Sequence, residues 1–176
     1  MKLKEHSYAI EGKFDITVLD KDGNIKQHIT NHNRIVDDGL ELIASLIAGQ
    51  ENDPQFISRP TYCAIGADNK EVASTDKALG NEVYRKAFDK VVRTNNNVEF
   101  TTTFLPAEPD LNRCRIQEVA LFNSNVGGKM FNRSIFSQVN KIKDDVLRIV
   151  YTITLNSQAS PYDKEWEDET PQPPSP

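Results

Sequence analysis

Apolar and polar residues alternate most regularly near the end of this 176-residue chain, over residues 147–155. The apolar positions of one face are Leu147, Ile149, Tyr151, Ile153 and Leu155. The other face carries Arg148, Thr152 and Thr154, with Val150 as the exception. A period of two is typical of a half-buried β-strand, so this run predicts a strand with one face in the core.

Two more apolar runs, residues 115–123 and 129–137, stand on either side of Gly127-Gly128. Glycine reaches the positive φ that tight turns need, and this arrangement is a strong local signal for a β-hairpin. The stretch from Arg115 to Leu155 therefore predicts three long strands against which the rest of the chain packs. It contains no set of nucleophile, base and metal ligand, so we expect its role to be structural.

Similar alternation predicts two further hairpins, residues 14–18 with 25–29 and residues 90–93 with 98–104. Residues 61–66 predict another strand, and residues 67–80 a long polar loop. Residues 81–88 stay open between a helical turn and the start of a strand.

One short helix is expected near residues 38–48, where the apolar residues Leu40, Leu42, Ile43, Leu46 and Ile47 leave little polar face. Asp37 or Asp38 is suited to cap its N-terminus, and Gly49 is suited to end it. Because the helix has so little polar surface, it should lie largely buried against a sheet rather than anchor the chain to a membrane.

These elements predict a mainly β fold, an antiparallel β-sandwich with a jelly-roll-like arrangement, formed by residues 1–156. The remaining residues, 157–176, have a different composition. They hold five of the nine prolines and five acidic residues against one lysine. This acidic proline-rich tail cannot bury enough apolar surface to fold alone, so we expect it to be disordered.

The net charge of the chain is concentrated in the tail. The tail accounts for −4 of the net charge of −5, which leaves −1 for the first 156 residues. A near-neutral domain without a basic stripe argues against binding to nucleic acid. The chain has no apolar run of about 20 residues and no signal-peptide pattern, so we expect a soluble protein made in a cytoplasm, without a membrane partner.

Few residues suggest chemistry. Cys63 and Cys114 lie in apolar runs and are expected to be buried thiols, with a disulfide as the alternative. His28 and His32 would lie about 13 Å apart on a strand, too far apart for one metal ion. The turn at residues 20–24 resembles the start of a calcium loop but lacks the closing glutamate. No nucleophile elbow or phosphate-binding loop occurs, so we expect no enzyme activity, metal or cofactor.

Two charged residues interrupt the apolar runs of the central hairpin, Glu118 and Arg133. A charge in a buried strand needs a partner. We therefore predict a cross-strand ion pair between Glu118 and Arg133; the alternative is that both side chains face water.

Two aromatic residues stand out in the tail, Tyr162 and Trp166, the latter being the only tryptophan of the chain. Tyrosine and tryptophan dominate binding hot spots, so these residues are candidates for docking on a partner. The alternative is an inert solubilising tail.

Several motifs in a fixed order resemble a known group of proteins. They are residues 34–49, Tyr62-Cys-Ala-Ile-Gly-Ala, Ala78-Leu-Gly-Asn-Glu-Val-Tyr-Arg, Ile116-Gln-Glu-Val-Ala-Leu-Phe-Asn, Gly127-Gly-Lys-Met-Phe-Asn-Arg, Lys141 and residues 147–155. Together they resemble the small structural proteins of tailed-bacteriophage virions, often labelled tail-fibre or tail-associated proteins. The chain differs from that pattern at Gly66-Ala-Asp, where Gly-Thr-Gly is usual, and at Ala120, where glycine is usual.

The resemblance implies a non-enzymatic virion component of the fibre, baseplate or neck, synthesised in the host cytoplasm. Its partners would be other virion proteins and copies of itself, in a homo-oligomer such as a trimer. One alternative is a capsid decoration or collar protein. Another is a module that binds host carbohydrate, which would need exposed aromatic residues on loops; the three long loops (50–59, 67–80 and 105–113) hold only Phe56.

Overall fold

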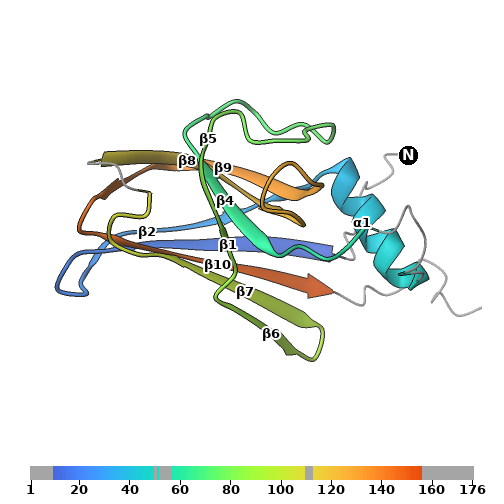
Figure 1. Ribbon diagram of the computed structural model, residues 1–176. Helices are drawn as coiled ribbons and strands as arrows, with labels where there is room; N and C mark the ends of the chain where they lie inside the picture. The colour runs from blue at the N-terminus through green and yellow to red at the C-terminus, as the bar shows by residue number, and fades with distance from the viewer. Residues whose placement is uncertain (1–9, 50, 52–56, 110–112, 156–176) are drawn as a thin grey trace, which may run out of the picture.

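The computed structural model describes residues 10–49, 51, 57–109 and 113–155, and in these residues two antiparallel sheets pack face to face (Figure 1). The first sheet has the order β2 (Ile25–His32), β1 (Ile10–Leu19), β10 (Val146–Leu155), β7 (Asn97–Phe104) and β6 (Lys90–Thr94). The second has the order β3 (Arg34–Ile35), β9 (Met130–Ile142), β8 (Arg113–Phe122), β4 (Tyr62–Gly66) and β5 (Glu82–Ala87). The predicted mainly β, antiparallel sandwich is confirmed.

The three predicted hairpins are present as β1–β2, β6–β7 and β8–β9. Residues 82–87, which the sequence left open, form strand β5. The long loop of residues 67–81 connects β4 to β5, and these two strands pair with each other.

The core lies between the two sheets. Alternate residues of β1 and β10 are paired across the first sheet with their side chains inward, as Phe14 with Tyr151 and Ile16 with Ile149. The Phe14 and Tyr151 rings lie 4.4 Å apart, and Phe131 of the second sheet meets Tyr151 edge to face. Burying one such side chain contributes about 1.5–3 kcal/mol, and β10 supplies three of them, Leu147, Ile149 and Tyr151.

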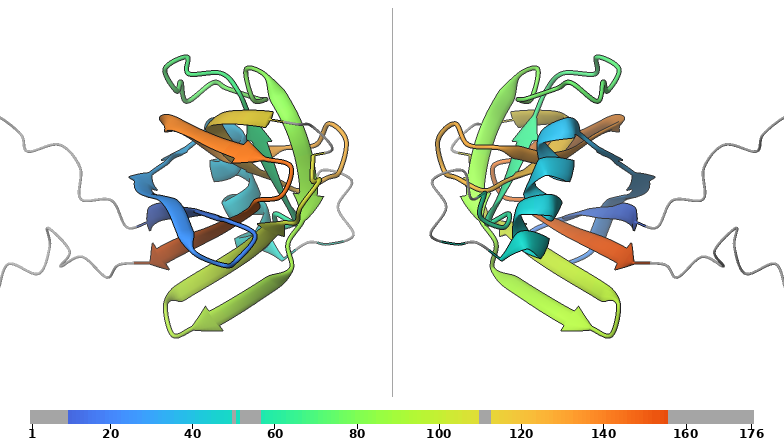
Figure 2. Two further views of the ribbon diagram at one scale, coloured as in Figure 1. Left: turned by 90° about the vertical axis from the view of Figure 1, so that its left-hand side faces the viewer. Right: turned by 90° about the vertical axis from the view of Figure 1, so that its right-hand side faces the viewer.

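Helix α1 (Asp37–Ala48) lies across one end of the sandwich (Figure 2). Gly49 ends it in the left-handed conformation, at φ 64°, as predicted. The predicted N-cap is wrong, because Val36 takes that position and makes no side-chain hydrogen bond. Asp37 and Asp38 lie instead in the first turn, where a negative charge is favourable to the helix dipole.

The expectation that this helix is largely buried is also wrong. Of its apolar residues only Leu42 is buried, whereas Leu40 is 55% and Ile47 81% exposed. The helix contacts β9 along one face, and Gly39 makes the closest approach. A Cβ atom at Gly39 would lie 2.0 Å from the Phe131 carbonyl oxygen, so only glycine fits there.

Candidate functional site

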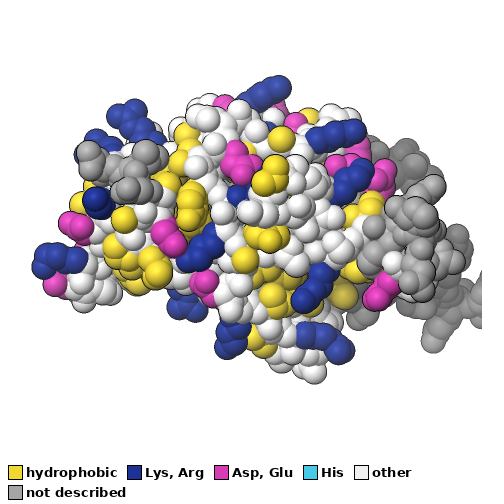
Figure 3. All heavy atoms as spheres, in the orientation of Figure 1, with side chains coloured by type: hydrophobic (Ala, Val, Ile, Leu, Met, Phe, Trp, Pro, Cys, Tyr) yellow, Lys and Arg dark blue, Asp and Glu magenta, His cyan; other side chains and the backbone are white. Residues whose placement is uncertain are grey.

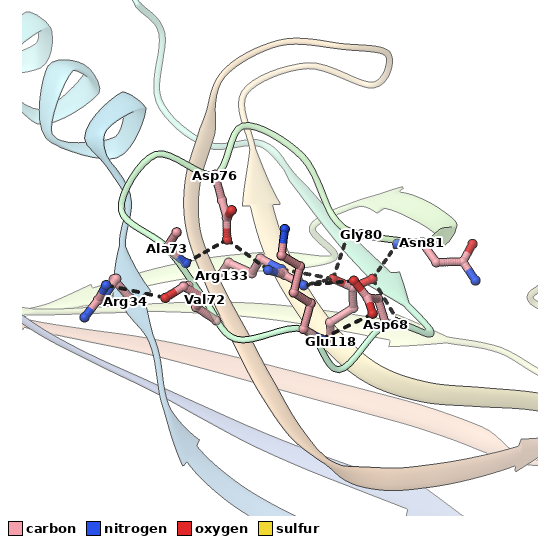
Figure 4. Close-up of polar contacts among 10 residues, drawn as sticks. Arg34, Asp68, Val72, Ala73, Asp76, Gly80, Asn81, Glu118 and Arg133 are labelled. Carbon is pink, nitrogen blue, oxygen red and sulfur yellow. Dashed lines mark hydrogen bonds and ion pairs between the residues drawn. The ribbon is translucent and has the colours of Figure 1, made fainter.

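One polar cluster of the described residues is centred on Glu118, in the middle of β8. Its side chain is fully buried, and its two carboxylate oxygens accept five hydrogen bonds (Figure 4). Three come from the backbone N–H groups of Asp68, Gly80 and Asn81, at 3.2, 3.0 and 2.8 Å. The other two come from Nε and Nη2 of Arg133, at 3.0 and 2.8 Å.

The predicted ion pair between Glu118 and Arg133 is therefore present. In the β8–β9 register, Arg133 is opposite Ala120, two residues from Glu118, so the two side chains share one face of the sheet. Both side chains are almost completely buried, at 0% and 2% exposed. An ion pair with this degree of burial requires the extra hydrogen bonds that surround it.

Arg133 also binds two aspartates of the loop over residues 67–81. Its Nη1 lies 2.9 Å from Asp76 Oδ2, and its Nη2 lies 3.7 Å from Asp68 Oδ2. Burial alone would lower the pKa of Arg133, but hydrogen bonds to Asp76 and Glu118 outweigh it and raise the pKa. The guanidinium group is therefore held in its charged form.

The cluster fixes the path of this loop over the second sheet. Glu118 binds both ends of the loop, while Arg133 binds Asp76 in its middle. Asp76 in turn accepts the Ala73 N–H at 3.0 Å, and Arg34 of β3 reaches the Val72 carbonyl at 3.4 Å. Because a carboxylate offers about four lone pairs, five donors saturate Glu118, which cannot also act as a base or metal ligand.

The sequence predicted the central pair but not the loop residues that bind it. The three backbone N–H donors carry no sequence signal, because every residue except proline supplies one. Asp68 and Asp76 are visible as carboxylates in a long loop, yet only the pairing of β4 with β8 brings that loop to Glu118.

A second series of charges lies at the other end of β9. Lys86 binds Glu108 at 2.7 Å, and Lys26 binds Asp145 at 2.7 Å. Lys141 is 2% exposed, and burial lowers its pKa against the opposing effect of Asp145. These residues lie near the margin of the core and hold strands together.

Both cysteines are free buried thiols, as predicted. Burial raises the pKa of Cys63 to about 12 and also raises the pKa of Cys114. Because the thiolate is the reactive form, neither cysteine is suited to nucleophilic chemistry.

A shallow groove of about 570 Å³ crosses the outer face of the first sheet. Its lining is mostly polar and comes from all five strands, including Lys13, His32, Lys90, Glu99 and Thr152. Among the described residues, no Phe, Tyr or Trp contributes to this lining. On the face of the molecule shown in Figure 3, basic and acidic side chains are interspersed rather than gathered into one broad patch.

The other candidate residues divide into two groups. Tyr162 and Trp166 lie outside the described residues. His28 and His32 are both on β2, and His28 Nε2 is 3.8 Å from Asp15 Oδ1. Within the described ranges, no three His, Cys, Asp or Glu residues gather where they could hold a metal ion. None of the described residues belongs to a helix with the length and apolar character needed to span a membrane.

Comparisons with protein-family models, with curated proteins and with solved structures find no match to this chain.

Proposed function

We propose that this chain is a non-enzymatic structural component of a tailed-phage virion, located in the tail, which acts by binding copies of itself and neighbouring virion proteins. The order of motifs from Arg34 to Leu155 supports this proposal by its resemblance to small virion proteins. The chain would be made in the host cytoplasm and then enter the particle.

The observation that carries the proposal is that the buried charges of Glu118 and Arg133 hold a surface loop in place. Glu118 is the most deeply buried carboxylate among the described residues, and backbone N–H groups and Arg133 together fill both of its oxygens with five hydrogen bonds. A catalytic carboxylate needs room for a substrate and a free lone pair. This one instead holds a 15-residue loop (67–81) in place, which suits a protein that presents fixed surfaces to partners.

The test is to locate the chain in the particle. Virions purified on a density gradient from the encoding phage should contain its peptides by mass spectrometry, and particles from a nonsense mutant should lack them. A low copy number supports a tail position, and one copy for each capsid subunit or capsomer supports the alternative of a decoration protein. Absence of the chain from intact wild-type virions would refute the proposal.

The groove on the first sheet supports a second candidate, a module that binds host carbohydrate through hydrogen bonds alone, since none of the described residues that line it is a Phe, Tyr or Trp on which a sugar could stack. Carboxylate, ammonium, amide and hydroxyl groups line it together, and these groups hydrogen-bond to sugars. Screening the purified protein on a glycan array tests this candidate, with Glu99→Gln and Lys90→Met as groove variants. Binding that both variants weaken supports it, and the absence of binding to any glycan at millimolar concentration rejects it.

A further inference from the structure

A sheet edge offers unpaired backbone N–H and C=O groups, and the sandwich has four such edges. Strand β3 contains only two residues. Strand β2 is held to the opposite sheet by Gln27 and Asn31, whose side chains donate to backbone carbonyls of β9 at 3.0 and 2.6 Å. Strand β5 is held similarly, because Lys86 donates to the Thr103 carbonyl of β7 at 3.0 Å.

The fourth edge, strand β6, differs from these three. Within the described part of the chain it is hydrogen-bonded only to β7, and the β6–β7 hairpin extends away from the body of the sandwich (Figures 1 and 2). Its sequence is Lys90-Val-Val-Arg-Thr94, and Val91 is 40% exposed. Adjacent β-branched residues on an open edge favour pairing with another strand.

The direction in which the backbone N–H and C=O groups of β6 point follows from the hairpin turn. Asn95 and Asn96 form a two-residue turn, which Thr94 and Asn97 close as a hydrogen-bonded pair. Such pairs alternate along an antiparallel ladder. The backbone N–H and C=O groups of Val92 therefore form hydrogen bonds with β7, while those of Val91 and Arg93 point outward from the edge.

These outward groups match a second copy of the same strand. When two β6 strands are placed antiparallel with Val92 opposite Val92, Val91 of each strand is opposite Arg93 of the other. Their outward N–H and C=O groups then meet in the correct phase to form hydrogen bonds. Lys90 is opposite Thr94, so no two like charges face each other directly.

We propose that two copies of this chain pair through β6 about a twofold axis at Val92, which joins their first sheets into one continuous sheet. The inference rests on the proposed assembly function and names a contact for it. A five-residue edge is small, so the free dimer is weak, and repetition within a particle would strengthen the contact. This twofold contact is distinct from the trimer that the resemblance implies.

Cross-linking tests the contact directly. On the axis, Val92 of the two copies forms a non-hydrogen-bonded pair with Cα atoms about 4.5 Å apart, within reach of a disulfide. The full-length Val92→Cys variant should therefore form disulfide-linked dimers in a glutathione buffer. Its dimers should form about tenfold faster than those of a control variant whose cysteines the proposed contact keeps far apart. Cys63 and Cys114 are 1% and 4% exposed and do not compete.

Thr152→Cys is the matched control, because Thr152 lies on the same face of the same sheet but in the central strand β10. Val91→Pro removes one outward N–H group and should abolish dimerisation in sedimentation velocity at high concentration. If circular dichroism shows that this variant also unfolds, Val91→Lys replaces it, since a charge pointing inward at an edge blocks pairing.

Equal cross-linking of Val92→Cys and Thr152→Cys, or dimers that survive Val91→Lys in a folded chain, would overturn the inference. Its failure is separable from that of the proposed function. A chain found in virions without a β6 contact refutes only this contact. A Val92 dimer formed by a chain absent from virions refutes only the virion role.

Discussion

Replacing Glu118 by glutamine should destabilise the protein strongly, although the change removes one charge and almost no volume. The buried carboxylate accepts hydrogen bonds through both oxygens: Oε1 binds the N–H groups of Asp68 and Asn81, and Oε2 binds Gly80 and Arg133. Glutamine retains one of these oxygens and replaces the other with an NH₂ group. If the oxygen faces Gly80 and Arg133, the NH₂ group meets the N–H groups of Asp68 and Asn81; in the opposite orientation it meets Gly80 and both Arg133 donors. At least two donors therefore face a donor instead of an acceptor.

The magnitude follows from the same contacts. Each buried donor left without an acceptor costs about 1–3 kcal/mol, and removing one partner of a buried ion pair costs about 3–5 kcal/mol. These terms overlap, and Arg133 keeps Asp76 at 2.9 Å as a counter-ion. We therefore expect the free energy of unfolding to fall by about 3–5 kcal/mol, a large share of the 5–15 kcal/mol typical of a domain.

Urea unfolding followed by far-UV circular dichroism measures this loss. Circular dichroism is preferred to tryptophan fluorescence because the only tryptophan lies outside the described residues. Glu41→Gln is the matched control, because Glu41 is 60% exposed and its contact with Lys129 should contribute less than about 1 kcal/mol. A second readout is local. Trypsin should cleave the Glu118→Gln variant faster at Lys70 and Lys77, both exposed in the loop that Glu118 holds.

The reasoning is refuted if Glu118→Gln loses no more stability than Glu41→Gln. It is also refuted if global stability falls while cleavage at Lys70 and Lys77 in the folded state does not accelerate, because the carboxylate would then not be what holds the loop.

Three further predictions concern other parts of the fold. Lys141→Met should leave the free energy of unfolding unchanged or raise it by about 1–2 kcal/mol, because a buried charge is removed while Asp145 keeps Lys26 as a partner. A fall in the free energy of unfolding, measured by urea unfolding, contradicts this. Gly39→Ala should lower the melting temperature through a loss of about 1–3 kcal/mol, since its methyl group would overlap a backbone carbonyl of β9; an unchanged melting temperature contradicts it. The hydrogen bond from Lys86 lowers the pKa of Glu108 below 4.5, so its contribution to stability is complete above about pH 5 and is lost as the pH falls through the lowered pKa. Glu108→Gln should therefore weaken the acid dependence of stability, and an identical pH profile contradicts this.

The strands could be predicted from the sequence because alternation is a local property. Residues 147–155 show it almost without interruption, and β10 buries Leu147, Ile149 and Tyr151 of the predicted face, while Ile153 is half-buried and Leu155 is exposed at the end of the strand. The exposure of helix α1 could not be predicted in this way. Its apolar residues leave little polar face and are compatible with burial on most sides, and the close approach of Gly39 to β9 is what identifies the covered face.

In the candidate site, too, the local sequence predicts one part and not the other. Glu118 and Arg133 are conspicuous because a charge inside an apolar strand needs a partner, and the hairpin turn places both on one sheet face. The loop residues that donate to Glu118 precede it by 37, 38 and 50 residues, and their donors are backbone N–H groups. Such partners follow from the pairing between hairpins, which hairpin signals leave undetermined.

The cluster has a further consequence for assembly. A buried ion pair contributes little net stability by itself, so the more important effect of Glu118 and Arg133 is to select one path for the loop over residues 67–81. Fixing the backbone of one free residue costs about 1–2 kcal/mol, and a loop ordered only on binding would subtract this cost from the affinity. A loop already held at both ends and in its middle avoids most of it. The buried charges therefore support the proposed role indirectly, by giving any partner that meets this loop a surface whose shape is set before the encounter.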